Sequence, residues 1–201
     1  MDWTAIIERF NLQVDDSSEL SDSESLALAN EVYREIQNDR NWEWLKKEYT
    51  GVQSTSVPYI ALPTDLKTLS PNSEGVSVVF VWTNFEEYKV IPFSKRREYR
   101  DMLGYCYLDI PNSRLVFTKQ PTAANAVEFD YVCVAPDLTT TTEPLFKEMF
   151  HDTISYWMAS KFNPIELTDK AQSYQRENTI TYMEKLSQIR LQDSREKLAM
   201  S

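Results

Sequence analysis

The sequence predicts an α+β fold, in which N- and C-terminal helices form an α-helical bundle with an inserted antiparallel β module. Apolar residues recur at helical spacing near both ends of the chain. The middle instead holds short runs rich in Val, Thr, Tyr and Ile between Pro, Asn and Asp residues, as strands and turns do. Hydrophobic residues make up 42% of the 201 residues, so a sizeable core can form.

Two helices are expected at the N-terminal end. The first is indicated by apolar residues at helical spacing, namely Trp3, Ile6, Ile7, Phe10 and Val14. An acidic, serine-rich loop follows at 15–23, and Ser23 or Ser25 can cap the next helix. That second helix should end near Asp39, and its inner face is expected to hold Leu26, Ala29, Val32, Tyr33 and Ile36.

Six to eight short strands are expected in the middle of the chain. The candidate runs are 52–62, 66–69, 76–82, 85–91, 105–110, 114–118 and 127–134. Pro111, Asn112 and Ser113 should form the turn of a hairpin between two of these strands. The charged run 94–103 is typical of a helix that opens on a serine cap.

Helices return at the C-terminal end. Pro144 suits the first helical position, and Asn163-Pro164 should end this helix. Its apolar stripe is Leu145, Phe146, Met149, Phe150, Thr153, Ile154, Trp157 and Met158. Thr168 or Asp169 can cap a long final helix, whose inner face is expected to hold Ala171, Tyr174, Asn178, Tyr182, Leu186 and Ile189.

These patterns predict a division of the chain into two domains. Residues 1–49 supply the N-terminal helices, 50–138 form the β-rich module, and 139–201 supply the C-terminal helices and tail. The first and third segments together would make one helical bundle.

The charge of the chain restricts its functions. Its net charge is −10 and its isoelectric point is about 4.7. An acidic surface repels phosphate, which disfavours tight nucleic-acid binding but suits a wall that DNA must pass without sticking. With three glycines and no G-x-G-x-x-G or Walker-type run, the chain offers no glycine-rich phosphate loop.

No residue pattern points to catalysis, a metal or a cofactor. His151 is the single histidine, and Glu148 and Asp152 beside it do not make up the three or four ligands that a metal site needs. Cys106 and Cys133 lack C-x-x-C spacing and are expected as reduced thiols, although a disulfide between them stays open. The many carboxylates leave a carboxylate-based hydrolase as an alternative.

Lys95, Arg96, Arg97 and Arg100 form the one dense basic cluster. Three interpretations stay open: contact with phosphate, contact with an acidic protein, or a solvated face.

No apolar run approaches the roughly 18 to 20 residues that span a bilayer, and the polar start lacks the basic region of a signal peptide. We therefore expect an intracellular protein without a membrane partner.

Trp42 and Trp44 lie two residues apart beside charged residues. They would point to opposite sides of an extended chain, and would lie about 200° apart in a helix. One interpretation is a structural anchor that seats a helix end on a core. The other is an aromatic platform for a base or sugar, which normally comes with cations on a β surface, whereas Glu43 intervenes here. We favour the anchor.

The order of these features resembles the head-to-tail adaptor (connector) proteins of tailed bacteriophages, such as tail accessory factors and the tail tubular protein A type. The resemblance covers about residues 3 to 190. It is carried by the helix 26–36 leading into Asn41-Trp42-Glu43-Trp44-Leu45, the strand and turn of 59–66 with Leu62-Pro63-Thr64-Asp65, the run 90–94, and the run 150–157 before the final helix. The acidic loop at 15–23 departs from that pattern.

The resemblance implies a virion structural protein rather than an enzyme. Its copies would form a ring of twelve beneath the portal protein at the neck, extending the DNA channel and joining the capsid to a downstream neck or tail protein. Genomic DNA would pass without specific binding, and no cofactor would be needed. The residues implied to dock on the portal are Ile189, Leu191, Arg195, Leu198 and Met200, and Trp42 and Trp44 would seat the bundle against the β module.

Two further expectations concern assembly. A closed ring needs a heterologous interface, in which one patch meets a different patch, and aromatic residues such as Tyr88, Tyr99, Tyr105 and Tyr107 suit such patches. We expect the free protein to be monomeric or weakly associated, with the portal as template. The alternative within the same class is another neck or baseplate component.

Overall fold

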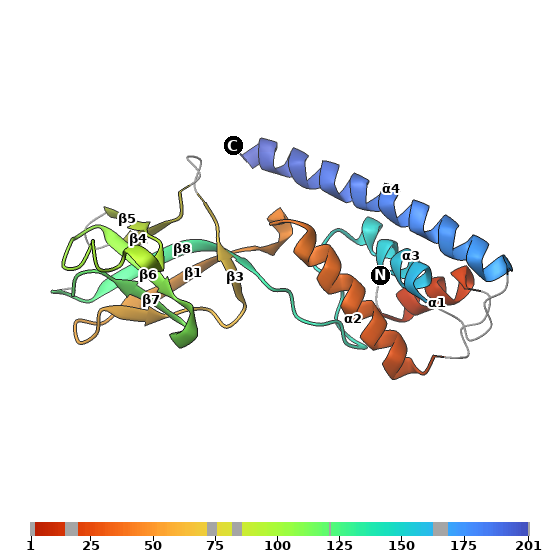
Figure 1. Ribbon diagram of the computed structural model, residues 1–201, viewed down its shortest axis with the longest axis horizontal. Helices are drawn as coiled ribbons and strands as arrows, with labels where there is room; N and C mark the ends of the chain where they lie inside the picture. Colours follow the sequence, from red (N-terminus) through yellow and green to blue (C-terminus); the bar gives the residue numbers. More distant parts are fainter. Residues whose placement is uncertain are drawn as a thin grey trace. The chain divides into compact units, whose positions relative to one another are not determined.

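The computed structural model describes residues 3–14, 20–71, 76–81, 86–120, 122–162 and 169–200. The chain forms two compact units (Figure 1). Residues 1–44 and 135–201 make a helical unit, and residues 45–134 make a β unit. Compactness alone does not make the two units independent domains, so the predicted division at 50–138 stays a prediction.

The helical unit contains four α-helices in its described part. They are α1 (Trp3–Gln13), α2 (Asp22–Asp39), α3 (Asp152–Lys161) and α4 (Asp169–Met200), with a 3₁₀ turn at Glu148–Phe150. α3 packs against α1, α2 and α4. The core holds apolar side chains from all four helices, among them Ile6, Phe10, Val32, Ile36, Ile154, Met158 and Leu186. The amphipathic helices were predicted; their arrangement as a closed bundle stays a prediction.

The start of α2 differs from the prediction by a few residues. Ser21, not Ser23 or Ser25, is the N-cap residue. Its side chain accepts a hydrogen bond from the Glu24 backbone N–H, and the Glu24 carboxylate accepts one from the Ser21 backbone N–H. This reciprocal pair is a capping box, which satisfies two backbone donors that the helix leaves open. Most of the loop predicted at 15–23, residues 15–19, lies outside the described residues.

The prediction that a helix begins at Pro144 is wrong. Residues 145–150 form a bend and a 3₁₀ turn, and α3 begins at Asp152. One reason is tertiary, because the Leu145 backbone N–H donates to the Tyr33 hydroxyl, 2.9 Å away on α2. Asn163-Pro164 and Thr168 lie outside the described residues, as does the side chain of Asp169.

The β unit is one eight-stranded sheet, counted over the described residues. Its strands are β1 (Lys46–Gln53), β2 (Tyr59–Ala61), β3 (Leu66–Leu69), β4 (Val78–Val81), β5 (Glu86–Val90), β6 (Tyr105–Asp109), β7 (Arg114–Phe117) and β8 (Asn125–Cys133). The order is β1-β8-β4-β5-β6-β7-β2, with β3 also paired to β8. β1 and β2 contact each other, so the sheet curls nearly into a barrel.

Two predictions about the β unit need correction. The sheet is not wholly antiparallel, because β5 and β6 pair in parallel, Lys89 opposite Tyr105. The run 52–62 is not one strand but the end of β1, a turn, and β2. The other strands lie within the expected runs to within two residues, except that Trp82 and Phe85 fall outside the described residues. The hairpin at Pro111-Asn112-Ser113 is confirmed as the connection between β6 and β7.

The predicted charged helix at 94–103 is also wrong. The segment is a 3₁₀ turn, Phe93–Lys95, followed by hydrogen-bonded turns. Asp101 adopts a left-handed conformation (φ 63°), and its N–H donates to the Thr118 carbonyl at the end of β7. A continuing helix would not allow that contact with the sheet, so the pairing with β7 overrides the local helical pattern.

Candidate functional site

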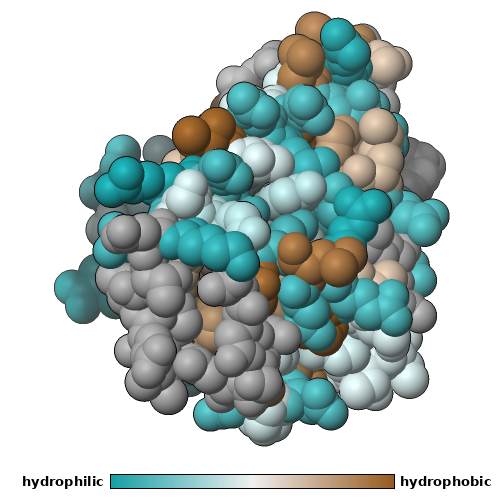
Figure 2. Space-filling model, turned by 90° about the vertical axis from the view of Figure 1, so that its right-hand side faces the viewer, coloured by the Kyte–Doolittle hydropathy of each residue, from teal (hydrophilic) through white to brown (hydrophobic). Residues whose placement is uncertain are grey.

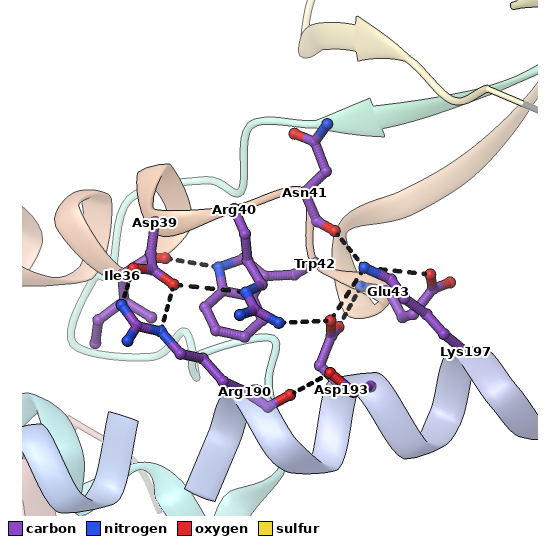
Figure 3. A network of polar contacts seen from close by, with 10 residues as sticks. Ile36, Asp39, Arg40, Asn41, Trp42, Glu43, Arg190, Asp193 and Lys197 are labelled. Atoms are coloured by element: carbon purple, nitrogen blue, oxygen red, sulfur yellow. Dashed lines mark hydrogen bonds and ion pairs between the residues drawn. The ribbon is translucent and has the colours of Figure 1, made fainter. Parts of the chain in front are cut away.

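Trp42 supplies the C-terminal cap of α2 (Figure 3). The side chain is fully buried, and its indole Nε1–H donates to the Ile36 carbonyl oxygen, 2.6 Å away. The last four carbonyl groups of a helix have no partner within it, and Ile36 is one of them. α2 ends in an extended residue, Arg40, and not in a glycine cap. The tryptophan therefore satisfies a carbonyl that the backbone leaves open.

Trp44 lies beside Trp42 rather than opposite it. The two rings stack with centroids 6.0 Å apart and 26° between their planes. The prediction of opposite directions assumed one regular backbone, whereas the chain changes from an extended Arg40 to a 3₁₀ turn at Glu43–Leu45. Trp44 also packs against Tyr33 and Phe146, so its ring belongs to an aromatic cluster of the helical unit. The seating of helices against the β module stays a prediction.

A cavity of about 110 Å³ lies between the segment 145–150 and α4. Its lining residues are Trp44, Leu145, Phe146, Lys147, Phe150, Ile189, Gln192, Asp193 and Glu196. The Trp44 indole N–H is buried and has no hydrogen-bond acceptor among the described residues. The structure thus brings together Trp44 and Ile189, which sequence reasoning had assigned to separate roles.

Asp193 fixes the second half of α4 to the chain that follows α2 (Figure 3). Its side chain is 1% exposed, and Oδ1 accepts a hydrogen bond of 2.7 Å from the Glu43 backbone N–H. Two cations face its other oxygen: Lys197 at 3.2 Å and Arg40 at 3.8 Å. Lys197 also donates to the Asn41 carbonyl at 3.1 Å. A buried carboxylate is tolerated here because a backbone donor and two cations surround it.

Two ion pairs extend this attachment on either side. Arg190 on α4 pairs with Asp39 at the end of α2 through two hydrogen bonds, which lower the pKa of the Asp39 carboxyl below its usual value. Glu196 accepts from Gln192 and pairs with Lys147, and these contacts lower its pKa too. Sequence reasoning missed both ion pairs, because partners 151 residues apart (Asp39 and Arg190) or 49 residues apart (Lys147 and Glu196) leave no local signal.

The residues expected to dock on the portal do not lie on one face. Ile189 is 3% exposed and lines the cavity beside Trp44. Leu191 and Leu198 are 54% and 77% exposed, and Arg195 is exposed as well. The side chain of Met200 is outside the described part. Of the predicted docking residues whose side chains are described, Leu191, Arg195 and Leu198 are therefore accessible, whereas Ile189 is part of the interior.

α4 also exposes apolar residues that sequence reasoning did not single out. The inner face is confirmed by burial of Ala171, Asn178, Tyr182, Leu186 and Ile189, while Tyr174 is 36% exposed. Opposite that face, Ile180 and Met183 are 61% and 51% exposed. Figure 2 shows hydrophobic residues as separate spots among hydrophilic ones on the face turned to the viewer. The sequence alone could have indicated this exposure, because the positions of Ile180 and Met183 are out of phase with the helical spacing of the inner face.

The basic cluster lies on the β unit in the turns after Phe93. The Arg96 guanidinium stacks 4.0 Å from the centroid of the Phe93 ring and donates to the Phe93 carbonyl. Lys95, Arg97 and Arg100 are exposed. Lys95 and Arg97 have no ion-pair partner within the described ranges. The cluster is therefore an accessible cationic surface next to an exposed aromatic ring.

The two units differ sharply in charge. Residues 45–134 carry ten basic and ten acidic residues, whereas the rest of the chain carries 11 basic and 21 acidic residues. The whole net charge of −10 thus belongs to the helical unit. A neutral β unit with a local cationic cluster and an acidic helical unit are suited to different partners.

Residues suited to catalysis or metal binding are not gathered into a site in the described ranges. His151 is buried, and its Nε2 lies 2.7 Å from the Phe146 carbonyl oxygen. No group of three or more His, Cys, Asp or Glu residues there could hold a metal ion. Cys106 and Cys133 are buried free thiols, and burial raises the pKa of both. Such thiols are poor nucleophiles.

A carboxylate-based hydrolase finds no support in the described carboxyl groups. A general acid of that class needs a raised pKa. The carboxyl groups whose pKa clearly departs from the ordinary value, namely Glu24, Asp39, Asp65, Glu148 and Glu196, all have a lowered pKa.

None of the helices in the described ranges has the length and hydropathy of a bilayer span.

The described structure consists of a helical unit fastened by polar contacts around the buried Asp193 and a β unit with one curled sheet. Residues 1–200 match the model of the SU10 adaptor protein family, so the chain belongs to that family. It is a phage adaptor, with a structural place in the virion. A search of the curated proteins found no match.

Proposed function

We propose that this protein is a head-to-tail adaptor whose copies form a ring, of twelve subunits, beneath the portal. The ring extends the DNA channel and joins the capsid to a downstream neck or tail protein. The observation that carries this proposal is the match of nearly the entire chain to an adaptor family. The finer resemblance to the tail tubular protein A type is part of the proposal.

The portal-facing surface in this proposal is the C-terminal half of α4. Leu191, Arg195 and Leu198 are exposed there, and the ion pairs of Asp193, Arg190 and Glu196 hold the helix in place. A helix that is already ordered loses little conformational entropy when a partner binds it. Met200 completes the proposed surface at the end of the helix.

The acidic helical unit supports the proposed passage of DNA. Like charges keep a phosphate backbone from adhering to a wall, so the genome slides instead of binding. The neutral β unit is then the surface for the downstream partner, because a contact between proteins needs no such repulsion. Trp42 and Trp44 act in this proposal as the structural anchor that keeps the end of α2 and the cavity beside α4 in place.

The test is co-expression with the portal protein of the same genome, followed by native mass measurement. We expect a discrete complex with one copy of this protein per portal subunit. A portal that assembles fully and carries no copy would contradict the proposal. It would favour another neck or baseplate component instead.

A pair of variants locates the docking surface. Leu191→Asp with Leu198→Asp should abolish the complex, because charges replace two exposed apolar contacts. The matched control is Leu12→Asp on α1, where an equally apolar side chain is 85% exposed. Equal binding by both variants would move the docking surface away from α4.

A further inference from the structure

The turns after Phe93 form a rigid basic and apolar surface on the β unit, which we call the basic knob and define as residues 93–103. Its apolar members are Phe93, Met102 and Leu103, which are 45%, 45% and 53% exposed. Its accessible cations are Lys95, Arg97 and Arg100. Exposed apolar side chains that lie together with arginines are typical of protein interfaces.

Several contacts preorganise the knob. Tyr99 packs on Tyr105 of β6 with ring centroids 4.5 Å apart, and Phe93 packs on Tyr107 of the same strand at 5.6 Å. The Thr118 hydroxyl donates to the Met102 carbonyl. These contacts fix the turns to the sheet, so little entropy would be lost when a partner covers them.

The outer face of α4 has the complementary chemistry. Each residue of an α-helix is rotated by 100°, so five residues between positions 177 and 187 fall within an arc of about 120°. We call them the acidic stripe: Glu177, Ile180, Met183, Glu184 and Ser187. All five are exposed, and the buried residues Asn178, Tyr182 and Ile189 lie on the opposite side of the helix.

Charges on the stripe are available for a partner. Neither Glu177 nor Glu184 makes a side-chain ion pair with any residue that the structure describes. Ile180 and Met183, exposed by half or more, lie between the two acids. The stripe therefore presents apolar contacts with negative charges, as the knob presents apolar contacts with positive charges.

We propose that the basic knob of one copy docks on the acidic stripe of α4 of the next copy. The two surfaces differ, so the contact is heterologous, which is the kind that closes a ring. The same chain supplies both halves, and their charges are opposite. The occupant of the knob is thus a second copy of this chain. The inference deepens the proposed function and rests on it in assigning the contact to the ring.

Cross-linking tests this contact without depending on the portal. One chain carries Arg97→Cys and the other Glu184→Cys; the native Cys106 and Cys133 are fully buried and give little background. Under mild oxidation, the mixture should give at least about tenfold more disulfide-linked dimer than either variant alone. The control mixture replaces Arg97→Cys with Lys119→Cys, another exposed cation of the β unit.

Charge reversal gives a second, reciprocal readout. Arg97→Glu with Arg100→Glu makes both surfaces acidic, and Glu177→Lys with Glu184→Lys makes both basic. Neither variant should associate with itself, but a mixture of the two should associate, and sedimentation measures both. The matched control reverses Lys89 and Lys119, which changes the net charge equally and should leave association as in the native chain.

The contradicting outcomes are distinct. No cross-link above the control mixture, in free protein and on the portal alike, overturns the inference even if a ring forms on the portal. A cross-link without any portal binding keeps the inference and removes the proposed function. If the knob variant loses retention on duplex DNA and no cross-link forms, the knob is a phosphate-binding surface and the inference is wrong.

Discussion

The helical unit and the β unit of this chain are each stabilised internally by different kinds of contact. The helical unit carries all of the net charge and fastens α4 with polar contacts, several of them around the buried Asp193. The β unit is neutral and is held by ladder hydrogen bonds over an apolar core. We therefore expect the position of α4 in the helical unit to depend on a few specific polar contacts, whereas the sheet distributes its stability over many equivalent hydrogen bonds.

The largest expected effect comes from Trp42. Trp42→Ala removes a fully buried ring and the N–H that caps α2, and should destabilise the helical unit by about 3–5 kcal/mol. Trp42→Phe keeps most of the ring and should cost about 1–2 kcal/mol. Hydrogen exchange measured unit by unit should show the loss in the helices. Equal loss in the strands would contradict independent stabilisation.

The corresponding change in the β unit is Leu115→Ala in β7. Leu115 is fully buried, and the cavity left behind should cost about 3 kcal/mol. Exchange should then accelerate in the strands, and the amides of α2 and α4 should keep their protection. Uniform acceleration across both units would show that they unfold as one.

Asp193 tests the polar attachment of α4. Asp193→Ala leaves the partly buried Glu43 N–H without its acceptor and should destabilise the helical unit by about 2 kcal/mol. Ser194→Ala, one position further along and exposed, should change the stability by less than about 0.5 kcal/mol. Chemical denaturation followed by helical circular dichroism measures both. Similar midpoints for the two variants would remove the special role of Asp193.

The smallest effect concerns pH. Because Arg190 lowers the Asp39 pKa in the folded state, the unfolded state binds more protons between the folded pKa and the ordinary value of about 3.9. The stabilisation is therefore complete above the ordinary pKa and is lost as the pH falls through the folded pKa. Asp39→Asn should remove about 0.5–1 kcal/mol at neutral pH.

Melting temperatures of native and variant proteins, compared at pH 6 and pH 3, check this dependence. The difference between Asp39→Asn and the native chain should shrink at the lower pH. Asp101→Asn serves as the control, since that exposed acid lies in the β unit and pairs only with its neighbour Arg100 in the described structure. A difference for Asp39→Asn that does not change with pH would contradict the assigned cause.

Local patterns determined much of this protein in advance. In α1, α2 and α4 and in the strands, one side of each element is buried. Apolar residues therefore recur at a spacing of a few positions, which can be seen in the sequence alone. The hairpin between β6 and β7 follows from its own turn residues. The aromatic end of α2 and the order of elements were enough to indicate an adaptor, which the family match supports.

Tertiary structure decided the rest. Turns replace the predicted helix at 94–103 because Asp101 bonds to the end of β7, and α3 starts late because Leu145 bonds to Tyr33. The parallel pairing of β5 with β6 and the contacts of Asp193 join residues that share no local pattern. A sequence records the periodic burial of each element, but the partner of a buried polar group is chosen only when distant segments meet.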